Sequence, residues 1–107
     1  EQLDGFLENK RLLANKYKKF FKKSDIVFVT EVENSKSNYW LNTIILKDEQ
    51  QRDLLLDEAN SKGVMVRPIW VLMNKLPMFK ESQCGDLSHA DWLEQRVVNI
   101  PSSVVIS

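Results

Sequence analysis

An arginine followed by a proline, with a tryptophan three residues later, is the pattern in this chain that best suits ligand binding. Arg67 follows a short apolar run, Val64–Val66, and Pro68 fixes a bend directly after it. A guanidinium at such a bend can present its planar fork to a carboxylate or a phosphate, while Trp70 and Phe79 can supply apolar platforms. The same residues also fit a structural role, with the aromatic rings in the core and the arginine paired with an acidic neighbour. The residues alone leave both interpretations open.

A second segment combines polar and large aromatic residues at the entry to a predicted strand. Between Ser37 and Asn42, Tyr39 and Trp40 stand among small polar side chains. Core packing alone does not account for this composition. The segment is therefore a second candidate for contact with a ligand.

Signatures of metal, thiol or phosphate-loop chemistry are missing. His89 is the only histidine and has no second His or Cys at ligand spacing, so the sequence predicts no metal site. Cys84, the only cysteine, lies in a polar segment that does not favour a reactive thiolate. The three glycines are isolated and form no phosphate-binding loop.

The composition is that of an ordinary globular protein. The 107 residues suit a single domain, residues 1–107, and 15 basic residues balance 15 acidic ones. A nucleic-acid-binding protein usually shows a basic excess, and no apolar run approaches the roughly 20 residues that span a bilayer. The start of the chain lacks the basic and apolar segments of a signal peptide. We therefore expect a cytoplasmic protein with neither a nucleic-acid nor a membrane partner.

The first segment predicts an amphipathic helix of about six turns. Its apolar residues recur at intervals of three and four: Leu3, Phe6, Leu7, Leu13, Tyr17, Phe20 and Phe21. Its other face is basic: Lys10, Arg11, Lys16, Lys18, Lys19, Lys22 and Lys23. The aromatic residues can belong to the core while the lysines face water. The alternative is a free-standing module that binds a protein or an acidic membrane through this helix.

The elements that must position the candidate residues follow from the remaining pattern. Strands are expected at residues 26–30, 39–46, 64–66 and 98–100, and residues 101–103 turn the chain into Val104–Ile106. Asp48 with Gln51 predicts a capped helix that ends before Gly63 and turns Leu54, Leu55 and Ala59 inward. Ser88 is expected to cap a last helix. This order predicts an α+β, two-layer fold with a small, mostly antiparallel sheet and helices packed on one face.

The two candidate segments also resemble those of a known family, the DegT/StrS sugar aminotransferases. The likeness covers essentially the whole chain, and the order and spacing of its parts carry it. The matching segments are residues 2–7 with Lys10, Arg11 and Tyr17, then residues 38–40, 63–70, 76–79 and 96–103. The resemblance implies the small C-terminal domain of a fold-type-I transferase. It is strongest to members that aminate nucleotide-linked 4-keto-6-deoxy sugars for bacterial surface glycans, including lipopolysaccharide.

The resemblance implies a parent enzyme rather than a complete enzyme in these 107 residues. Such enzymes are usually homodimers that use pyridoxal 5'-phosphate and take an amino group from a donor such as glutamate. The cofactor's lysine, the acidic partner of its ring nitrogen and its phosphate ligands lie in the larger N-terminal domain of the family. None of the lysines in this chain corresponds to the catalytic one. We therefore expect no catalytic or cofactor-binding residue here, and an isolated chain without activity.

Four residues are the candidates that the resemblance implies for contact with a nucleotide sugar. Tyr39, Arg67, Trp70 and Asn74 match positions of the family that face the active-site cleft. Asn74 stands where many relatives have histidine, although an amide can still hydrogen-bond a hydroxyl or a phosphate. The resemblance also implies an apolar surface against the missing domain, with Trp70, Met73 and Met78 as its members.

Overall fold

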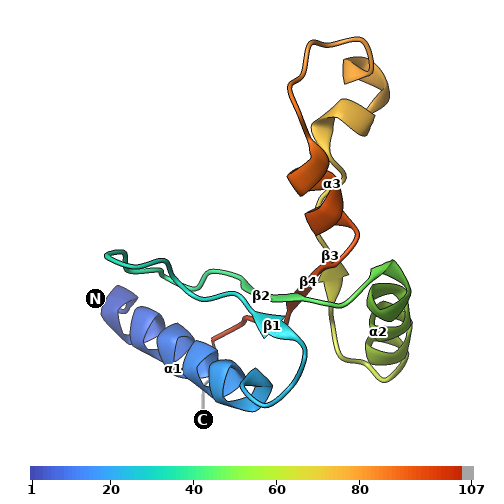
Figure 1. Cartoon of the computed structure of the whole chain (residues 1–107). Helices are drawn as coiled ribbons and strands as arrows, with labels where there is room; N and C mark the ends of the chain where they lie inside the picture. Colours follow the sequence, from blue (N-terminus) through green and yellow to red (C-terminus); the bar gives the residue numbers. More distant parts are fainter. Residues whose placement is uncertain (105–107) are drawn as a thin grey trace.

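The computed structural model describes residues 1–104 and combines three α-helices with a four-stranded antiparallel sheet in that range (Figure 1). The elements are, in chain order, α1 (Leu3–Phe21), β1 (Val27–Phe28), β2 (Asn42–Ile45), α2 (Glu49–Ser61), β3 (Arg67–Pro68), two 3-10 turns (Met73–Lys75 and Pro77–Phe79), α3 (Ser88–Glu94) and β4 (Val97–Ile100). Across the sheet the strand order is β1-β2-β4-β3. The predicted α+β class is confirmed. Val105 and Ile106 of the predicted terminal run lie outside the described residues.

The core lies between one face of the sheet and two helices. Alternate residues of the central strands point to this face, and Ile44 and Val98 are its most deeply buried apolar side chains. Tyr17 of α1 and Leu55 and Ala59 of α2 pack against the same cluster. The predicted arrangement of helices on one face of a small antiparallel sheet is therefore correct for α1 and α2.

The second predicted strand is shorter than expected at its start. Tyr39 has a φ of 47°, in the left-handed region that residues with a side chain seldom adopt, so regular pairing cannot include it. Pairing with β4 begins at Asn42, which lies opposite Ile100. The aromatic residues Tyr39 and Trp40 consequently belong to a loop that leads into β2.

The third strand lies later in the chain than predicted. Residues 64–66 were expected to form it, but Arg67 and Pro68 make the pairs, opposite Asn99 and Val98 of β4. Because β3 is an edge strand, the missing N–H of Pro68 can face away from the sheet without loss of a ladder hydrogen bond. The register places Arg67 and Asn99 on the same face of the sheet, opposite to the core.

The predicted ends of α2 are confirmed. The Asp48 carboxylate accepts a hydrogen bond from the backbone N–H of Gln51 at 2.8 Å. At the other end Gly63 has a φ of 80°, and the N–H of Val64 reaches back to the carbonyl of Ala59 at 2.9 Å. The expectation for Leu54 is wrong, because its side chain is 59% exposed. Leu55 and Leu56 fill the inner face instead.

Residues 69–96, here called the arm, connect β3 to β4 and project from the sheet (Figure 1). Lys75 contacts the carboxylates of both Glu94 and Asp91, and a Glu94 oxygen also accepts the backbone N–H of Leu72 at 2.8 Å. These contacts join the outgoing and returning segments of the arm. Ser88 does not cap α3 as predicted. It is the first helical residue, and its N–H donates to the Asp86 carboxylate at 3.0 Å.

The molecule exposes more surface than a compact domain of its mass. Its accessible area is 8623 Å², whereas a folded monomer of 12.5 kDa exposes roughly 6,200 Å². Its radius of gyration is 15.9 Å, against about 13 Å for a compact domain of this length. The projecting arm accounts for this open shape. Within residues 1–104, no helix combines the length and the apolar character needed to cross a bilayer.

Candidate functional site

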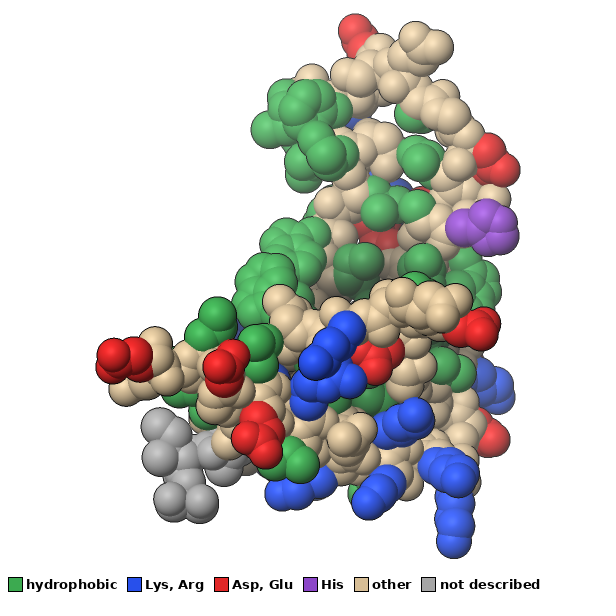
Figure 2. All heavy atoms as spheres, turned by 90° about the vertical axis from the view of Figure 1, so that its left-hand side faces the viewer, with side chains coloured by type: hydrophobic (Ala, Val, Ile, Leu, Met, Phe, Trp, Pro, Cys, Tyr) green, Lys and Arg blue, Asp and Glu red, His purple; other side chains and the backbone are tan. Residues whose placement is uncertain are grey.

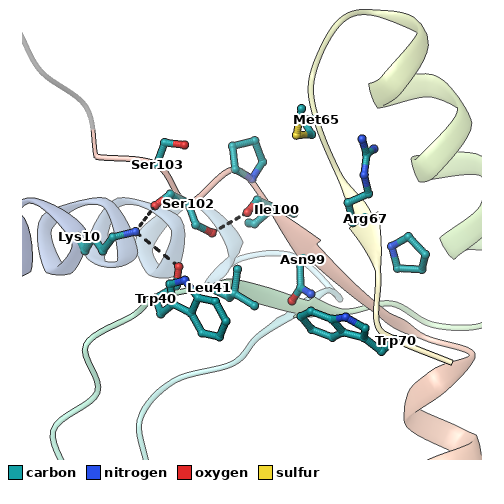
Figure 3. A pocket seen from close by; sticks show the side chains of 12 residues that line it. Lys10, Trp40, Leu41, Met65, Arg67, Trp70, Asn99, Ile100, Ser102 and Ser103 are labelled. Atoms are coloured by element: carbon teal, nitrogen blue, oxygen red, sulfur yellow. Dashed lines mark hydrogen bonds between the residues drawn. The ribbon is translucent and has the colours of Figure 1, made fainter. Parts of the chain in front are cut away.

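A pocket of about 660 Å³ lies at one end of the sheet, on the side of β3 and β4 (Figure 3). It is here called the Arg67 pocket. Five separate parts of the chain line it: Lys10 of α1, Trp40 and Leu41 before β2, Met65, Arg67 and Pro68 around β3, Trp70 at the start of the arm, and Asn99 to Ser103 from β4 onward. The pocket therefore unites Arg67 and Trp70, two of the residues singled out in the sequence.

Arg67 reaches the pocket from the edge strand. Its guanidinium donates to the side-chain oxygen of Asn60 at 3.2 Å and to the carbonyl of Val66 at 3.0 Å. Among residues 1–104 no carboxylate forms an ion pair with it, so the acidic neighbour of the structural interpretation is not found there. These two bonds use only one nitrogen of the fork. The remaining N–H groups are available to an anion.

Two tryptophan rings form an apolar wall of the Arg67 pocket. Trp40 is 67% exposed and Trp70 is 70% exposed, so neither ring belongs to the core. In Figure 3 both rings lie along the same side of the pocket, with Asn99 close to Trp70. Exposed indole rings beside a guanidinium and an amide suit a ligand that has a flat or apolar part and an anionic part.

Lys10 fixes the segment that carries Trp40. Its ammonium donates to the carbonyl of Ser102 at 2.7 Å and to the carbonyl of Trp40 at 3.5 Å. The Ser102 hydroxyl in turn accepts the N–H of Asn42 at 2.8 Å, at the first pair of β2. This network ties α1, the entry to β2 and the segment after β4 together at the rim of the pocket.

The sequence did not point to Lys10, Asn99 or Ser102 as pocket residues. Lys10 looked like one of seven basic residues on a solvated helix face, and its partners lie 30 and 92 residues away. Asn99 becomes recognisable only through the strand register that places it opposite Arg67. The sequence predicts Tyr39 as the contact residue of its segment, whereas the neighbouring Trp40 lines the pocket.

Tyr39 lies outside the Arg67 pocket, in a separate polar network. Its hydroxyl accepts the backbone N–H of Glu31 at 3.2 Å, and the Arg11 guanidinium lies 5.5 Å from its ring centre. Arg11 also forms a two-pronged ion pair with Glu31, at 2.9 and 3.1 Å, and donates to the carbonyl of Ser37 at 2.6 Å. The network fastens the loop of residues 31–39 to α1.

The Glu31 network has a testable pH dependence. The hydrogen bond from Arg11, and secondarily that from the Ser37 backbone, lower the pKa of Glu31 from 4.5 to about 2. Because the folded-state pKa is depressed, the stabilisation is present above pH 4.5 and is lost as the pH falls toward 2. We expect Glu31→Gln to lower the thermal midpoint at neutral pH and to reduce its acid dependence in this window.

Thermal unfolding of both proteins at stepped pH measures this effect. The Glu31 side chain is 26% exposed, so solvent screens part of its interaction with Arg11. Glu33→Gln, in the same loop but outside the network, is the control and should retain the wild-type acid dependence. Identical acid dependence in Glu31→Gln and wild type would contradict the assigned role.

Asn74 is also separated from the Arg67 pocket. It lies in the first 3-10 turn of the arm and lines a smaller hollow of about 300 Å³. Apolar and polar residues of the arm form the rest of this hollow, among them Leu72, Phe79 and Cys84. The structure thus brings Arg67 and Trp70 together and leaves Tyr39 and Asn74 at two other places.

The arm and the pocket together expose an apolar surface. Trp70, Met73 and Met78, the residues expected to meet a missing domain, are 70%, 65% and 70% exposed. In the space-filling view, apolar side chains gather along one side of the molecule, from the arm down toward the sheet (Figure 2). Monomeric proteins seldom leave several large apolar side chains exposed on one surface.

This surface predicts self-association of the isolated chain. We expect its weight-average mass in sedimentation equilibrium to rise with concentration, because association removes the exposed Trp70, Met73 and Met78 from water. The combined change of these three residues to serine should abolish the rise. As a control, Leu12→Ser with Leu54→Ser removes exposed apolar side chains from α1 and α2 and should leave the association unchanged. A strictly monomeric wild-type chain at high concentration would refute the prediction.

The basic face of α1 is smaller than the sequence suggested. Lys10 and Arg11 turn toward the fold and are held by the contacts described above. Five lysines remain at its C-terminal end: Lys16, Lys18 and Lys19 in the helix, Lys22 at its C-cap and Lys23 just beyond. The alternative of an interaction module therefore rests on this end of the helix.

Comparison with known proteins assigns the family. The whole chain, residues 1–107, matches the DegT/DnrJ/EryC1/StrS aminotransferase family. The chain belongs to this aminotransferase family. Over 102 residues it is 29% identical to a GDP-perosamine synthase of Escherichia coli O157:H7. The aligned region covers 95% of this chain and 28% of that protein.

The fold agrees with that of an aminotransferase of known structure. The crystal structure of the aminotransferase TlmJ from Streptoalloteichus hindustanus matches with a TM-score of 0.87 at 17% identity, over 99% of this chain and 29% of that one. The chain thus spans less than a third of the length of both proteins. The resemblance inferred from the sequence to this aminotransferase family is confirmed.

DegT/DnrJ/EryC1/StrS aminotransferases use pyridoxal phosphate in general, but the described residues do not form a site for it. A lysine that forms a Schiff base needs a neutral amine. Hydrogen bonds to the carboxylates of Glu94, chiefly, and Asp91 raise the pKa of Lys75 and so favour its charged form. Lys10, the lysine of the Arg67 pocket, uses its N–H groups on two backbone carbonyls. No carboxylate among residues 1–104 lines the Arg67 pocket, so none of them can pair there with the cofactor's ring nitrogen. The chemistry of the family therefore requires groups that residues 1–104 do not supply.

Proposed function

We propose that this chain is the C-terminal, substrate-side domain of a pyridoxal-phosphate-dependent aminotransferase. The parent enzyme converts a nucleotide-linked keto-deoxy sugar to an amino sugar for bacterial surface glycan synthesis. It works in the cytoplasm as a homodimer, with an amino acid such as glutamate as donor. Residues 1–107 form one domain of it, which is inactive alone because the lysine that binds the cofactor lies elsewhere in the parent protein.

The Arg67 pocket is the observation that carries this proposal. An arginine without a carboxylate partner among residues 1–104 lies beside two exposed tryptophan rings, in a family of aminotransferases. A nucleotide sugar has a diphosphate for the guanidinium, and a base and a sugar ring for the indole rings. The relative named GDP-perosamine synthase agrees with a nucleotide-linked sugar as substrate.

The four residues inferred from the sequence have different roles in this proposal. Arg67 and Trp70 contact the nucleotide sugar directly, together with Trp40. The Tyr39 hydroxyl accepts the backbone N–H of Glu31, so Tyr39 acts on the substrate indirectly. It holds the loop that carries Trp40. Asn74 reaches substrate at the other side of a cleft that the larger domain completes.

The first experiment is to read the coding DNA upstream of Glu1 in the same frame. We expect it to continue through a domain of some 250 residues. The protein expressed from the complete frame should then bind pyridoxal phosphate and transfer an amino group from glutamate to a nucleotide-linked 4-keto-6-deoxy sugar. A start codon directly upstream of Glu1, or turnover by the 107-residue chain alone, would overturn the proposal.

A further inference from the structure

We propose that a groove between the second half of α1 and β1 binds an extended acidic segment of a partner protein, which adds a strand to the free edge of β1. The groove has a volume of about 510 Å³ and lies apart from the Arg67 pocket, with which it shares no residue. Its lining residues are Asn15, Lys18, Lys19, Phe21, Lys22, Phe28 and Thr30. We call it the α1–β1 groove.

The charge of the α1–β1 groove is positive. Lys18, Lys19 and Lys22 line it, and among residues 1–104 none of the three forms an ion pair with a carboxylate. Lys16 and Lys23 add to the same stretch of chain, which contains no acidic residue from Asn15 to Lys23. In Figure 2, Lys and Arg side chains gather along the lower edge of the molecule, the level at which α1 lies in Figure 1. The groove is thus complementary to a carboxylate-bearing ligand.

The floor of the groove offers unpaired backbone groups. β1 is one of the two edge strands of the sheet, and Val29 donates its N–H to the carbonyl of Thr43 in β2 at 2.9 Å. Because hydrogen-bonding direction alternates along an antiparallel strand, the N–H and C=O of Phe28 point away from β2, toward the open edge. An extended peptide can pair with such an edge through its main chain.

The spacing of the lysines fits a strand. Lys18 lies in α1, and Lys22 is its C-cap residue with a helical backbone, so about 6 Å separates them along the helix axis. Acidic residues at positions i and i+2 of a strand point to the same side and lie about 6.6–6.8 Å apart. A segment with an acidic residue at every second position can therefore bring two successive carboxylates to these two lysines.

The shape of the groove distinguishes a peptide from a lipid surface. A concave site with side walls of Phe21 and lysine stems accepts a narrow extended chain, whereas a flat bilayer would meet the outer lysines first. The apolar rings of Phe21 and Phe28 border the groove and suit β-branched side chains between the acidic ones. These features make an acidic, strand-forming segment the partner that fits.

Fluorescence anisotropy with a labelled synthetic peptide tests the proposal. The peptide has roughly seven residues, a usual strand length, with Glu alternating with Val or Thr. The protein expressed from its complete reading frame should bind it saturably, and the affinity should fall as the salt concentration rises from roughly 50 to roughly 300 mM. Lys18→Glu with Lys22→Glu should weaken binding by about tenfold or more.

Matched variants and probes separate this site from general attraction of charge. Lys16→Glu with Lys23→Glu makes the same change in net charge in α1 and two residues past its end, outside the lining of the groove, and should alter the affinity much less. A peptide with Pro at its centre, which cannot complete the strand pairing, should bind weakly despite an unchanged charge. Equal losses in the two lysine pairs, or equal binding of the Pro peptide, would overturn the proposal. Binding to phosphatidylglycerol vesicles without binding to the peptide would also overturn it, in favour of a lipid surface.

Discussion

Replacing Arg67 with alanine in the complete aminotransferase should raise the KM for the nucleotide sugar by roughly 10- to 150-fold and leave kcat nearly unchanged. A charge-assisted hydrogen bond contributes about 1.5–3 kcal/mol, which corresponds to this range. Among residues 1–104 the guanidinium hydrogen-bonds to Asn60 and to the Val66 carbonyl through one nitrogen, and Arg67 lines the same pocket as Trp40 and Trp70. An anionic group held equally in substrate and transition state affects binding more than the chemical step.

Steady-state kinetics with both substrates varied measures the effect and identifies the anion. Arg67→Lys keeps the charge but loses the planar fork, so it should recover only part of the affinity. Lys80→Ala, a charge deletion in the arm outside the lining of the pocket, is the control and should behave as wild type. A raised KM for glutamate with an unchanged KM for the sugar would show that Arg67 binds the amino donor, contrary to the proposal.

The regular elements could be predicted because short-range chemistry determines them. Asp48 and Gly63 end α2 through contacts made within a few residues, and both ends were predicted correctly. The apolar runs at residues 39–46 and 98–100 likewise predicted strands where β2 and β4 lie. Leu54 was misplaced because three consecutive leucines leave the inner positions of a helix ambiguous, and the packing of Leu55 and Leu56 decided it.

The pocket could be predicted only in part, because pairing across the chain creates it. Arg67 and Trp70 were found from local pattern, since a proline bend and an unusual aromatic residue mark them. Trp40 and Tyr39 are neighbours in the sequence, but the Trp40 ring lines the pocket while Tyr39, with a left-handed backbone, contacts Arg11 and Glu31. Lys10 has no local signal at all, since its role depends on Ser102 at the other end of the chain.

The open shape of the chain connects the fold to the proposed function. A domain that exposes Trp40, Trp70 and Met78 and carries its own small core fits a role as one wall of a larger cleft. The core must nevertheless be firm enough to hold β3 and β4 in register, because that register places Arg67 beside Asn99. The stability of the sheet and the geometry of the pocket are therefore linked. A mutation that tests the packing of the sheet also tests the strand register on which the pocket depends.

Replacing Ile44 with alanine should lower the free energy of unfolding by about 3 kcal/mol, whereas Ile45→Ala should cost about 1 kcal/mol or less. Ile44 is 2% exposed and belongs to the cluster between the sheet and the helices, while Ile45 points to the opposite face and is only partly buried. The same atoms are removed in both variants, so the difference reports the face on which each side chain lies. Urea unfolding followed by circular dichroism measures it. Equal losses would mean that β2 does not present alternate residues to the core, and the register that positions the Arg67 pocket would then be wrong.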